Sequence, residues 1–285
     1  MALDIKLAVS TWLWTSPFSS DTISLFPKIK EMGYDAVEIP VEDPSLIKTE
    51  IVDKALKENG LSPIICAAFG PSRDLTHDDP SYHQTSFDYI QACFDISASL
   101  GAEFVAGPMY SAVGKARLVS PEQKKIEWDR AVNNLHKVCQ MAEKSGQKIA
   151  LEALNRFETD LVNTTSDLMQ LISDINHPAA RVLLDGFHMN IEEPSIEAAI
   201  LKAGEKLIHV QVSENNRGTP GTGQTRWDDF KSGLEKVNYH GVVTIESFTP
   251  EIKELAGAVC IWGPLAESQD KFASEGFNFL KNSIV

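Results

Sequence analysis

The sequence predicts an α/β protein in which eight strands alternate with eight helices and close into a single (β/α)8 TIM barrel. Short apolar runs alternate with longer amphipathic segments along the whole chain, which is the pattern of strands followed by crossover helices. Glycines follow five of the amphipathic segments, where they can end helices (Gly33, Gly60, Gly101, Gly146 and Gly204). The length of 285 residues also suits such a barrel, which typically needs about 250 residues.

The expected elements follow this alternation in order. Strands are expected over residues 7–10, 36–39, 63–68, 104–107, 148–153, 182–185, 207–212 and 242–246. Helices are expected over 22–32, 49–59, 85–100, 121–145, 165–175, 196–203, 227–237 and 268–282. A doubly wound open sheet is the alternative, but no glycine-rich phosphate loop follows the first strand. Because no linker rich in Pro, Ser or Gly divides the chain, residues 1–285 are expected to form one domain.

The composition narrows the function. A net charge of −14 argues against nucleic acid and anionic membrane surfaces, since both require clustered Lys and Arg. No run of 18 apolar residues predicts a transmembrane helix. The first ten residues pass into a strand-like pattern without the basic and apolar regions of a signal peptide, so we expect a cytoplasmic protein. These features suit a small neutral ligand, or a cation held by carboxylates.

The cysteines are dispersed. Cys66, Cys93, Cys139 and Cys260 show no C-x-x-C spacing. This predicts reduced, packed thiols rather than a disulfide framework or a zinc site.

Polar side chains end the last four predicted strands. Glu152, Asp185 and Glu246 each follow an apolar run, and Gln211 lies near the end of the strand between Asp185 and Glu246. In (β/α)8 barrels the chemistry takes place at the carboxyl ends of the strands. Three carboxylates at one mouth repel one another unless they are protonated or neutralised.

Two explanations for these acids are open. They could be solvated at the rim or paired with the few nearby cations, Arg156, Arg181 and Arg217. A divalent metal would resolve the repulsion better, and oxygen ligands suit Mn²⁺ or Mg²⁺ more than zinc. We therefore expect a metal site.

Four motifs carry a resemblance to a known family. They are L-E-A-L-N-R-F-E (151–158), L-L-D-G-F-H-M-N (183–190), S-E-N-N-R-G-T-P-G-T-G (213–223) and T-I-E-S-F (244–248). Together they resemble the xylose-isomerase-like sugar epimerases, in particular the D-tagatose/D-allulose 3-epimerase family. The resemblance implies Mn²⁺, or Mg²⁺ or Co²⁺, held by Glu152, Asp185, the residue at position 211 and Glu246.

The resemblance also implies the roles of individual residues. Glu152 and Glu246 would act as two bases that flank the sugar carbon next to a carbonyl. Three further residues match those that bind the sugar near its carbonyl (Glu158, His188 and Arg217). Each also has an ordinary structural alternative: Glu158 could pair with Arg156, His188 could be a satisfied rim histidine, and Arg217 could be an exposed loop charge.

Gln211 departs from the family pattern. The epimerases usually carry H-x-H on this strand, whereas this chain has His209 and Gln211, both expected on the barrel interior. We expect the Gln211 carbonyl oxygen to bind the metal and His209 to lie deeper. A similar glutamine occurs in relatives that act on 3-keto-glycosides, including 3-dehydro-guloside 4-epimerases and the metal-bearing subunits of C-glycoside deglycosidases.

Other positions bear on the substrate. Free-ketose epimerases often place a Trp in the loop over residues 107–114, where this chain has Val113, which would leave space for an aglycone. Aromatic residues near the strand ends are either pocket walls or plain core (Trp12, Trp14, Phe69 and Phe248).

Three classes of function follow. The first is a metal-dependent epimerase or isomerase of a ketose or keto-glycoside. The second is a 3-keto-glycoside lyase or hydrolase, acting with or without a second subunit, and the third is a non-catalytic sugar-binding relative. Retention of the acids counts against the third. The charge and the shortage of further histidines count against the DNA-repair endonucleases of the same superfamily. A homodimer or homotetramer is implied by the resemblance alone.

Overall fold

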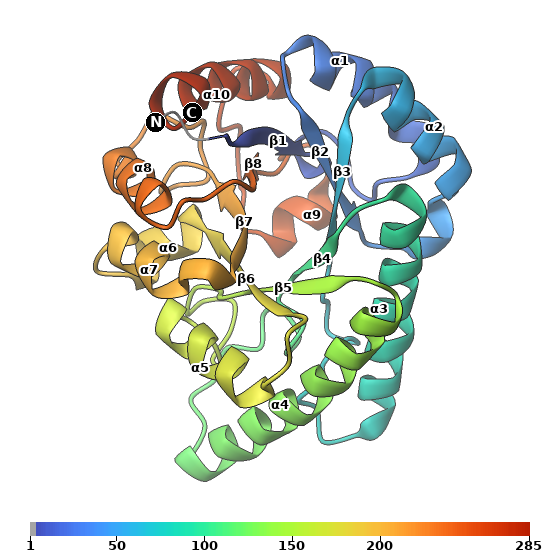
Figure 1. The fold of residues 1–285 in the computed structure, drawn as a ribbon, viewed down its shortest axis with the longest axis vertical. Coiled ribbons are helices and arrows are strands. Elements are labelled where there is room, and N and C mark those ends of the chain that lie inside the picture. Colours follow the sequence, from blue (N-terminus) through green and yellow to red (C-terminus); the bar gives the residue numbers. More distant parts are fainter. Residues whose placement is uncertain (1–3) are drawn as a thin grey trace.

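Eight parallel strands close into a barrel in sequence order (Figure 1). The structure, a computed structural model, describes residues 4–285. The strands are β1 (Lys6–Ser10), β2 (Ala36–Val41), β3 (Ser62–Ala67), β4 (Phe104–Gly107), β5 (Lys148–Glu152), β6 (Ala180–Asp185), β7 (Leu207–Val212) and β8 (Val242–Ile245). Pairing of β1 with β8 closes the sheet. This confirms the expected barrel, and each strand ends within two residues of its predicted bounds.

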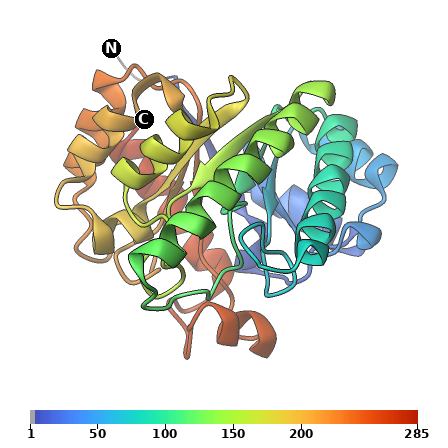
Figure 2. The same ribbon diagram turned by 90° about the horizontal axis from the view of Figure 1, so that it is seen from below.

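Helices surround the barrel (Figures 1 and 2). They are α1 (Leu25–Glu31), α2 (Thr49–Asn59), α3 (Pro80–Leu100), α4 (Pro121–Lys144), α5 (Thr165–Ile175), α6 (Gly186–Glu192), α7 (Ile196–Ala203), α8 (Trp227–Lys236), α9 (Lys253–Ala258) and α10 (Gln269–Ser283). The last of them, α10, lies beside β1, so the two ends of the described chain meet at the seam of the barrel. No helix within residues 4–285 is long and apolar enough to cross a membrane.

Local signals explain most helix boundaries. Helices α2 and α3 end at Gly60 and Gly101, which adopt the left-handed conformation with φ of 58° and 75°. Helix α3 begins at Pro80 rather than at residue 85, because Asp79 accepts a hydrogen bond from the Ser81 backbone N–H at 2.9 Å. The predicted helix over 22–32 is a 3₁₀ turn, Ser20–Ser24, followed by α1.

Two short helices were not predicted. Helix α6 begins at Gly186, where the Asp185 carboxylate accepts the Phe187 backbone N–H at 2.9 Å. Helix α9 lies in the segment that joins β8 to α10, and it is seen inside the ring of helices in Figure 1. Both helices lie in segments that follow the carboxyl ends of strands, α6 directly after β6 and α9 a few residues after β8, so both lie on the side of the barrel where the predicted site residues gather.

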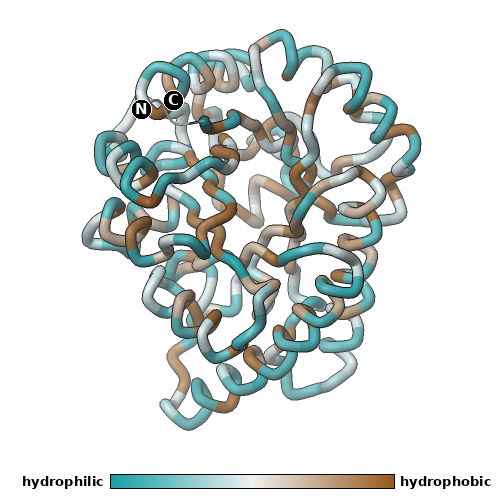
Figure 3. Tube along the Cα trace, viewed as in Figure 1, coloured by the Kyte–Doolittle hydropathy of each residue, from teal (hydrophilic) through white to brown (hydrophobic). Residues whose placement is uncertain are grey.

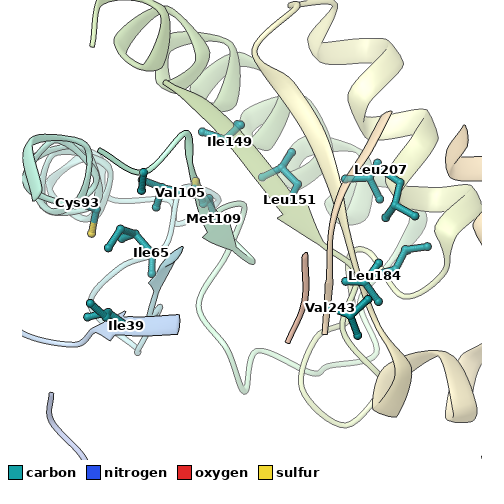
Figure 4. Packing of buried hydrophobic residues seen from close by; sticks show 14 of the residues in the cluster. Ile39, Ile65, Cys93, Val105, Met109, Ile149, Leu151, Leu184, Leu207 and Val243 are labelled. Carbon is teal, nitrogen blue, oxygen red and sulfur yellow. The ribbon is translucent and has the colours of Figure 1, made fainter. Parts of the chain in front are cut away.

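The two faces of each strand differ in character. Outward side chains such as Val9, Ile39 and Val105 belong to one large apolar core between strands and helices. Figure 3 shows hydrophobic residues along the barrel strands, and Figure 4 shows Ile39 and Val105 within this core. Inside the barrel, Ala8, Ala36 and Ile64 form a small apolar cluster of their own. Two residues further along two of these strands, the buried interior residues are Ser10 and Glu38. The interior therefore changes from apolar to polar toward the carboxyl ends of the strands.

The thiols differ in burial: three are packed as expected and one is not. All four cysteines are free, and Cys66, Cys93 and Cys139 are buried while Cys260 is exposed. Burial raises the pKa of the Cys93 and Cys139 thiols to about 12.

Candidate active site

Four neighbouring strands bring polar side chains to the mouth of the barrel at its carboxyl end. Glu152 ends β5, Asp185 ends β6 and Glu246 directly follows β8. Gln211 on β7 pairs in register with Asp185 on one side and with Thr244 on the other. All four side chains are buried, with at most 5% exposure. The structure thus places the predicted acids and Gln211 inside the mouth, not on a solvated rim.

Arg217 neutralises two of the carboxylates. Its Nη1 lies 2.7 Å from Asp185 Oδ2 and 2.8 Å from Glu246 Oε2. The guanidinium also lies over the Phe187 ring at 4.2 Å and near the Phe248 ring at 5.2 Å, which is a favourable cation–π geometry. Arg217 is buried at 5% exposure, so it is not an exposed loop charge.

The loop after β7 holds Arg217 in an unusual backbone conformation. Its φ is +63°, in a region that non-glycine residues rarely adopt. The Arg217 N–H donates to the Glu214 carbonyl at 2.9 Å, and Ser247 Oγ donates to the Arg217 carbonyl at 2.7 Å. The buried Glu214 carboxylate in turn accepts backbone N–H groups from Gly221 and Thr225. The folded loop therefore fixes where the guanidinium lies.

His188 on α6 faces two of the acids. Its Nε2 lies 3.4 Å from Glu152 Oε1 and 3.5 Å from Asp185 Oδ2. Its Nδ1 accepts the Asn155 backbone N–H at 3.1 Å, so the neutral ring carries its proton on Nε2, facing the acids. Burial opposes protonation, but the hydrogen bond to Glu152 and the charge of Asp185 outweigh it and raise the pKa of His188.

Glu158 is joined to this group through Asn155. Asn155 Nδ2 donates to Glu158 Oε1 at 2.8 Å and lies 2.9 Å from His188 Nδ1. The alternative partner of Glu158, Arg156, pairs with Glu192 instead, at 3.0 Å. Glu158 is half-buried. The sequence did not single out Asn155, although it stands inside the motif that carries Glu152 and Glu158.

One more buried carboxylate, Glu38, lies inside the barrel beside His209 and Gln211. Glu38 on β2 accepts hydrogen bonds from His209 Nε2 at 2.8 Å and from Gln211 Nε2 at 3.0 Å. Gln211 Nε2 also donates to Glu246 Oε1 at 3.0 Å. Sequence reasoning missed Glu38, although a single acid in the otherwise apolar strand A-V-E-I-P-V was a usable signal.

Burial and neighbouring charges separate the pKa values of the three acids. Burial raises the pKa of Glu152, and it raises the pKa of Glu246 well above its usual range. Burial alone would also raise the pKa of Asp185, but the charges of Arg217 and His188 outweigh it and lower that pKa. Divergent pKa values in one cleft are characteristic of acid–base sites.

The donor set fits a divalent cation. Glu152, Asp185 and His188 offer ligand atoms that all lie within 4.8 Å of one another. Gln211 Oε1 is buried and has no hydrogen-bond partner. Such an orphaned oxygen is costly without a ligand. Oxygen-rich donors of this kind suit a hard metal ion.

The aromatic residues separate into walls and core. Trp12 and Phe248 pack together at 5.5 Å in a cluster with residues from the α9 segment, Leu255 and Ile261. Phe248 also lies beside Arg217, so this cluster borders the site. Phe69 packs against Tyr89 in the main core, and Trp14 donates to Asp270 at 2.7 Å.

Comparisons with known proteins agree with this geometry. Residues 26–282 match the xylose isomerase-like TIM barrel family. An L-ribulose 3-epimerase of Methylomonas sp. (strain DH-1) is 30% identical over 251 residues, which are 87% of each chain. The crystal structure of a D-allulose 3-epimerase from Methylomonas sp. in complex with D-allulose covers 99% of both chains, with a TM-score of 0.92 and 27% identity.

A relative that acts on a different sugar is similar as well. The 3-dehydro-D-guloside 4-epimerase of Escherichia coli (strain K12) is 28% identical over 236 residues, covering 80% of this chain and 88% of the relative. These relatives confirm the expected class, a carbohydrate epimerase. With a matching family model over most of its length, the chain belongs to the xylose isomerase-like TIM barrel family.

Proposed function

We propose that the protein is a divalent-metal-dependent sugar epimerase that inverts a carbon next to the carbonyl of a ketose or keto-glycoside. The observation that carries this proposal is the pair Glu152 and Glu246. Both are buried, both have raised pKa values, and they stand at the ends of β5 and β8. His188 contacts Glu152, Arg217 contacts Glu246, and both also contact Asp185. A raised pKa suits a carboxylate that must both accept and release a proton near neutral pH.

The proposed reaction uses these two carboxylates in turn. One removes the proton from the sugar carbon, and the other delivers a proton to the opposite face, which inverts the centre. A divalent cation, when bound, supplies electrostatic stabilisation of the negative charge that develops on the sugar oxygens. Glu152, Asp185, Gln211 and Glu246 would hold it, and the oxygen donors favour Mn²⁺, with Mg²⁺ or Co²⁺ as alternatives.

Three other residues would position the sugar. His188 directs its Nε2–H into the site, and Arg217 presents further N–H donors there. Glu158, held by Asn155, offers acceptor oxygens for hydroxyl groups. Together they would bind the carbonyl end of the substrate and hold the reacting carbon between the two carboxylates.

A 3-keto-glycoside is the second candidate substrate. Gln211 and Val113 favour it, because a glutamine at this position resembles the relatives that act on such glycosides. The relative from Escherichia coli bears a name of this kind. The same two carboxylates would serve a 4-epimerase or, with a second subunit, a lyase. A cytoplasmic homodimer or homotetramer stays a prediction.

Incorporation of deuterium from solvent tests the proposal. Free ketoses and a 3-keto-glucoside would be incubated in D₂O with and without Mn²⁺ and followed by NMR. Metal-dependent exchange next to the carbonyl, lost in Glu246→Gln, is expected, and the preferred sugar decides between the two substrates. Absence of exchange with every sugar, while Mn²⁺ binds, would favour the non-catalytic sugar-binding alternative.

A further inference from the structure

Glu38 is a buried carboxylate that the proposed reaction does not use. It is fully buried inside the barrel on β2. No Lys or Arg in residues 4–285 forms an ion pair with it, and within these residues the one ion-pairing side chain in contact with Glu38 is His209, at 2.8 Å. An isolated buried charge is costly, so the groups that surround Glu38 must be arranged to satisfy it.

His209 contributes one fixed donor. Its Nε2 lies 2.8 Å from Glu38 Oε2, whereas its Nδ1 is buried and has no partner. Because Nε2 faces a carboxylate oxygen, this nitrogen carries a proton. His209 therefore donates to Glu38 and holds that carboxylate in place.

Gln211 contributes the second donor, and its orientation follows from Glu38. Its NH₂ group donates to Glu38 Oε1 and Glu246 Oε1, each at 3.0 Å. A rotated amide would lose both of these hydrogen bonds, and it would place the Gln211 oxygen against an acceptor oxygen of Glu38. The amide is thereby fixed with its nitrogen toward Glu38 and Glu246, and its Oε1 stays buried without a partner.

The same contacts argue against a second metal at this depth. Glu38, Cys66 and Glu246 offer ligand atoms that lie within 4.8 Å of one another. The Gln211 NH₂ group already donates to both of those carboxylates. A hydrogen-bond donor thus takes the place between them that a cation would need.

We propose that Glu38, held by His209, is a positioning residue that orients the Gln211 amide, so that its nitrogen holds Glu246 and its oxygen is presented to the cation. This inference rests on the proposed function, because it assigns Gln211 to the metal. Rotation of a side-chain amide by 180° exchanges its NH₂ donor and its oxygen acceptor. A fixed hydrogen-bond partner is therefore needed to keep the oxygen toward the cation. Partners behind metal ligands typically change metal affinity by about 10–100-fold.

The test is a double-mutant cycle on Mn²⁺ affinity, measured by calorimetry with the metal-stripped full chain. Glu38→Gln is expected to weaken Mn²⁺ binding by about tenfold. Gln211→Ala removes the amide, so Glu38→Gln in that background is expected to change affinity by less than about twofold. Glu127→Gln, which alters another buried acid paired with Arg117, is the matched control and is expected to bind Mn²⁺ normally.

Separate outcomes address the inference and the function beneath it. Wild-type binding together with unchanged affinity in a folded Glu38→Gln chain would overturn the inference alone. An equal loss in both backgrounds would do the same, since Glu38 would then act without the amide. A wild-type chain that neither binds Mn²⁺ nor exchanges a sugar proton would overturn both. If Glu38→Gln does not fold, Glu38→Asp keeps the carboxylate, shortens its reach and is expected to show the same suppression by Gln211→Ala.

Discussion

The two halves of the barrel contribute differently to the site. Strands β5 to β8 end in Glu152, Asp185, Gln211 and Glu246, which stand in or beside recognisable motifs. Strands β1 to β4 contribute one buried acid inside the barrel, Glu38, which is joined to the site by the hydrogen bonds of Gln211. In this account, the second half carries the chemistry and the first half orients it.

The proposed bases are the largest expected contributors in the second half. Glu152→Gln and Glu246→Gln should each lower kcat/KM by about 10²–10⁴-fold, because each removes one proton-transfer group. Steady-state epimerisation with a coupled or chromatographic assay measures this. Glu158→Gln is the matched control, and its loss should be much smaller because it only binds substrate. Similar losses in all three variants would contradict the two-base assignment.

A change at Arg217 tests how much the neutralisation of the second-half carboxylates contributes to stability. Arg217→Ala leaves Asp185 and Glu246 buried without their cation, which should lower the free energy of unfolding by about 3 kcal/mol in metal-free protein. Urea unfolding measures this. The control is Arg226→Ala, an exposed arginine of the same loop, which should change stability by less than about 0.5 kcal/mol. Equal stability of both variants would show that the buried pairs contribute little.

Gln211 is the position where the two halves meet. Gln211→Ala removes a proposed ligand oxygen and should weaken Mn²⁺ binding by about tenfold or more. Calorimetry on metal-stripped protein measures the affinity. Unchanged Mn²⁺ occupancy in this variant would remove Gln211 from the proposed ligand set.

The sequence predicted the second half of this site far better than the first. Glycine ends and apolar alternation located the strands to within two residues, and the motifs named the polar residues that the structure brings together. Glu38 stood outside any motif, and its role depends on contacts with His209 and Gln211 across the barrel. The position of Arg217 likewise depends on contacts with other strand ends, Asp185 and Glu246, which no local pattern encodes.

The smallest expected effect is the pH dependence of stability in metal-free protein. Burial raises the pKa of Glu246 and Glu152, so the folded protein binds a proton at each more tightly than the unfolded chain does. This binding stabilises the fold fully below the usual pKa of about 4.3, and the stabilisation is lost as the pH rises through the raised pKa values. Asp185 acts in the opposite direction, because its pKa is lowered and its contribution is lost only as the pH falls below about 3.9. The free energy of unfolding should therefore decrease as the pH rises above about 4.3 and through the raised pKa values of the two glutamates. Urea titrations should show a flatter dependence in Glu246→Gln, and an unchanged slope would count against a raised pKa at that residue.

The early distribution of deuterium tests the central claim most directly. A preferred sugar would be converted in D₂O with Mn²⁺, and product and remaining substrate would be separated and analysed by NMR after a few per cent of turnover. Two carboxylates on opposite faces predict deuterium at the inverted carbon of the product and almost none in the remaining substrate. Product that retains its original hydrogen, or substrate labelled as fast as product, would contradict the assignment of Glu152 and Glu246 as separate bases.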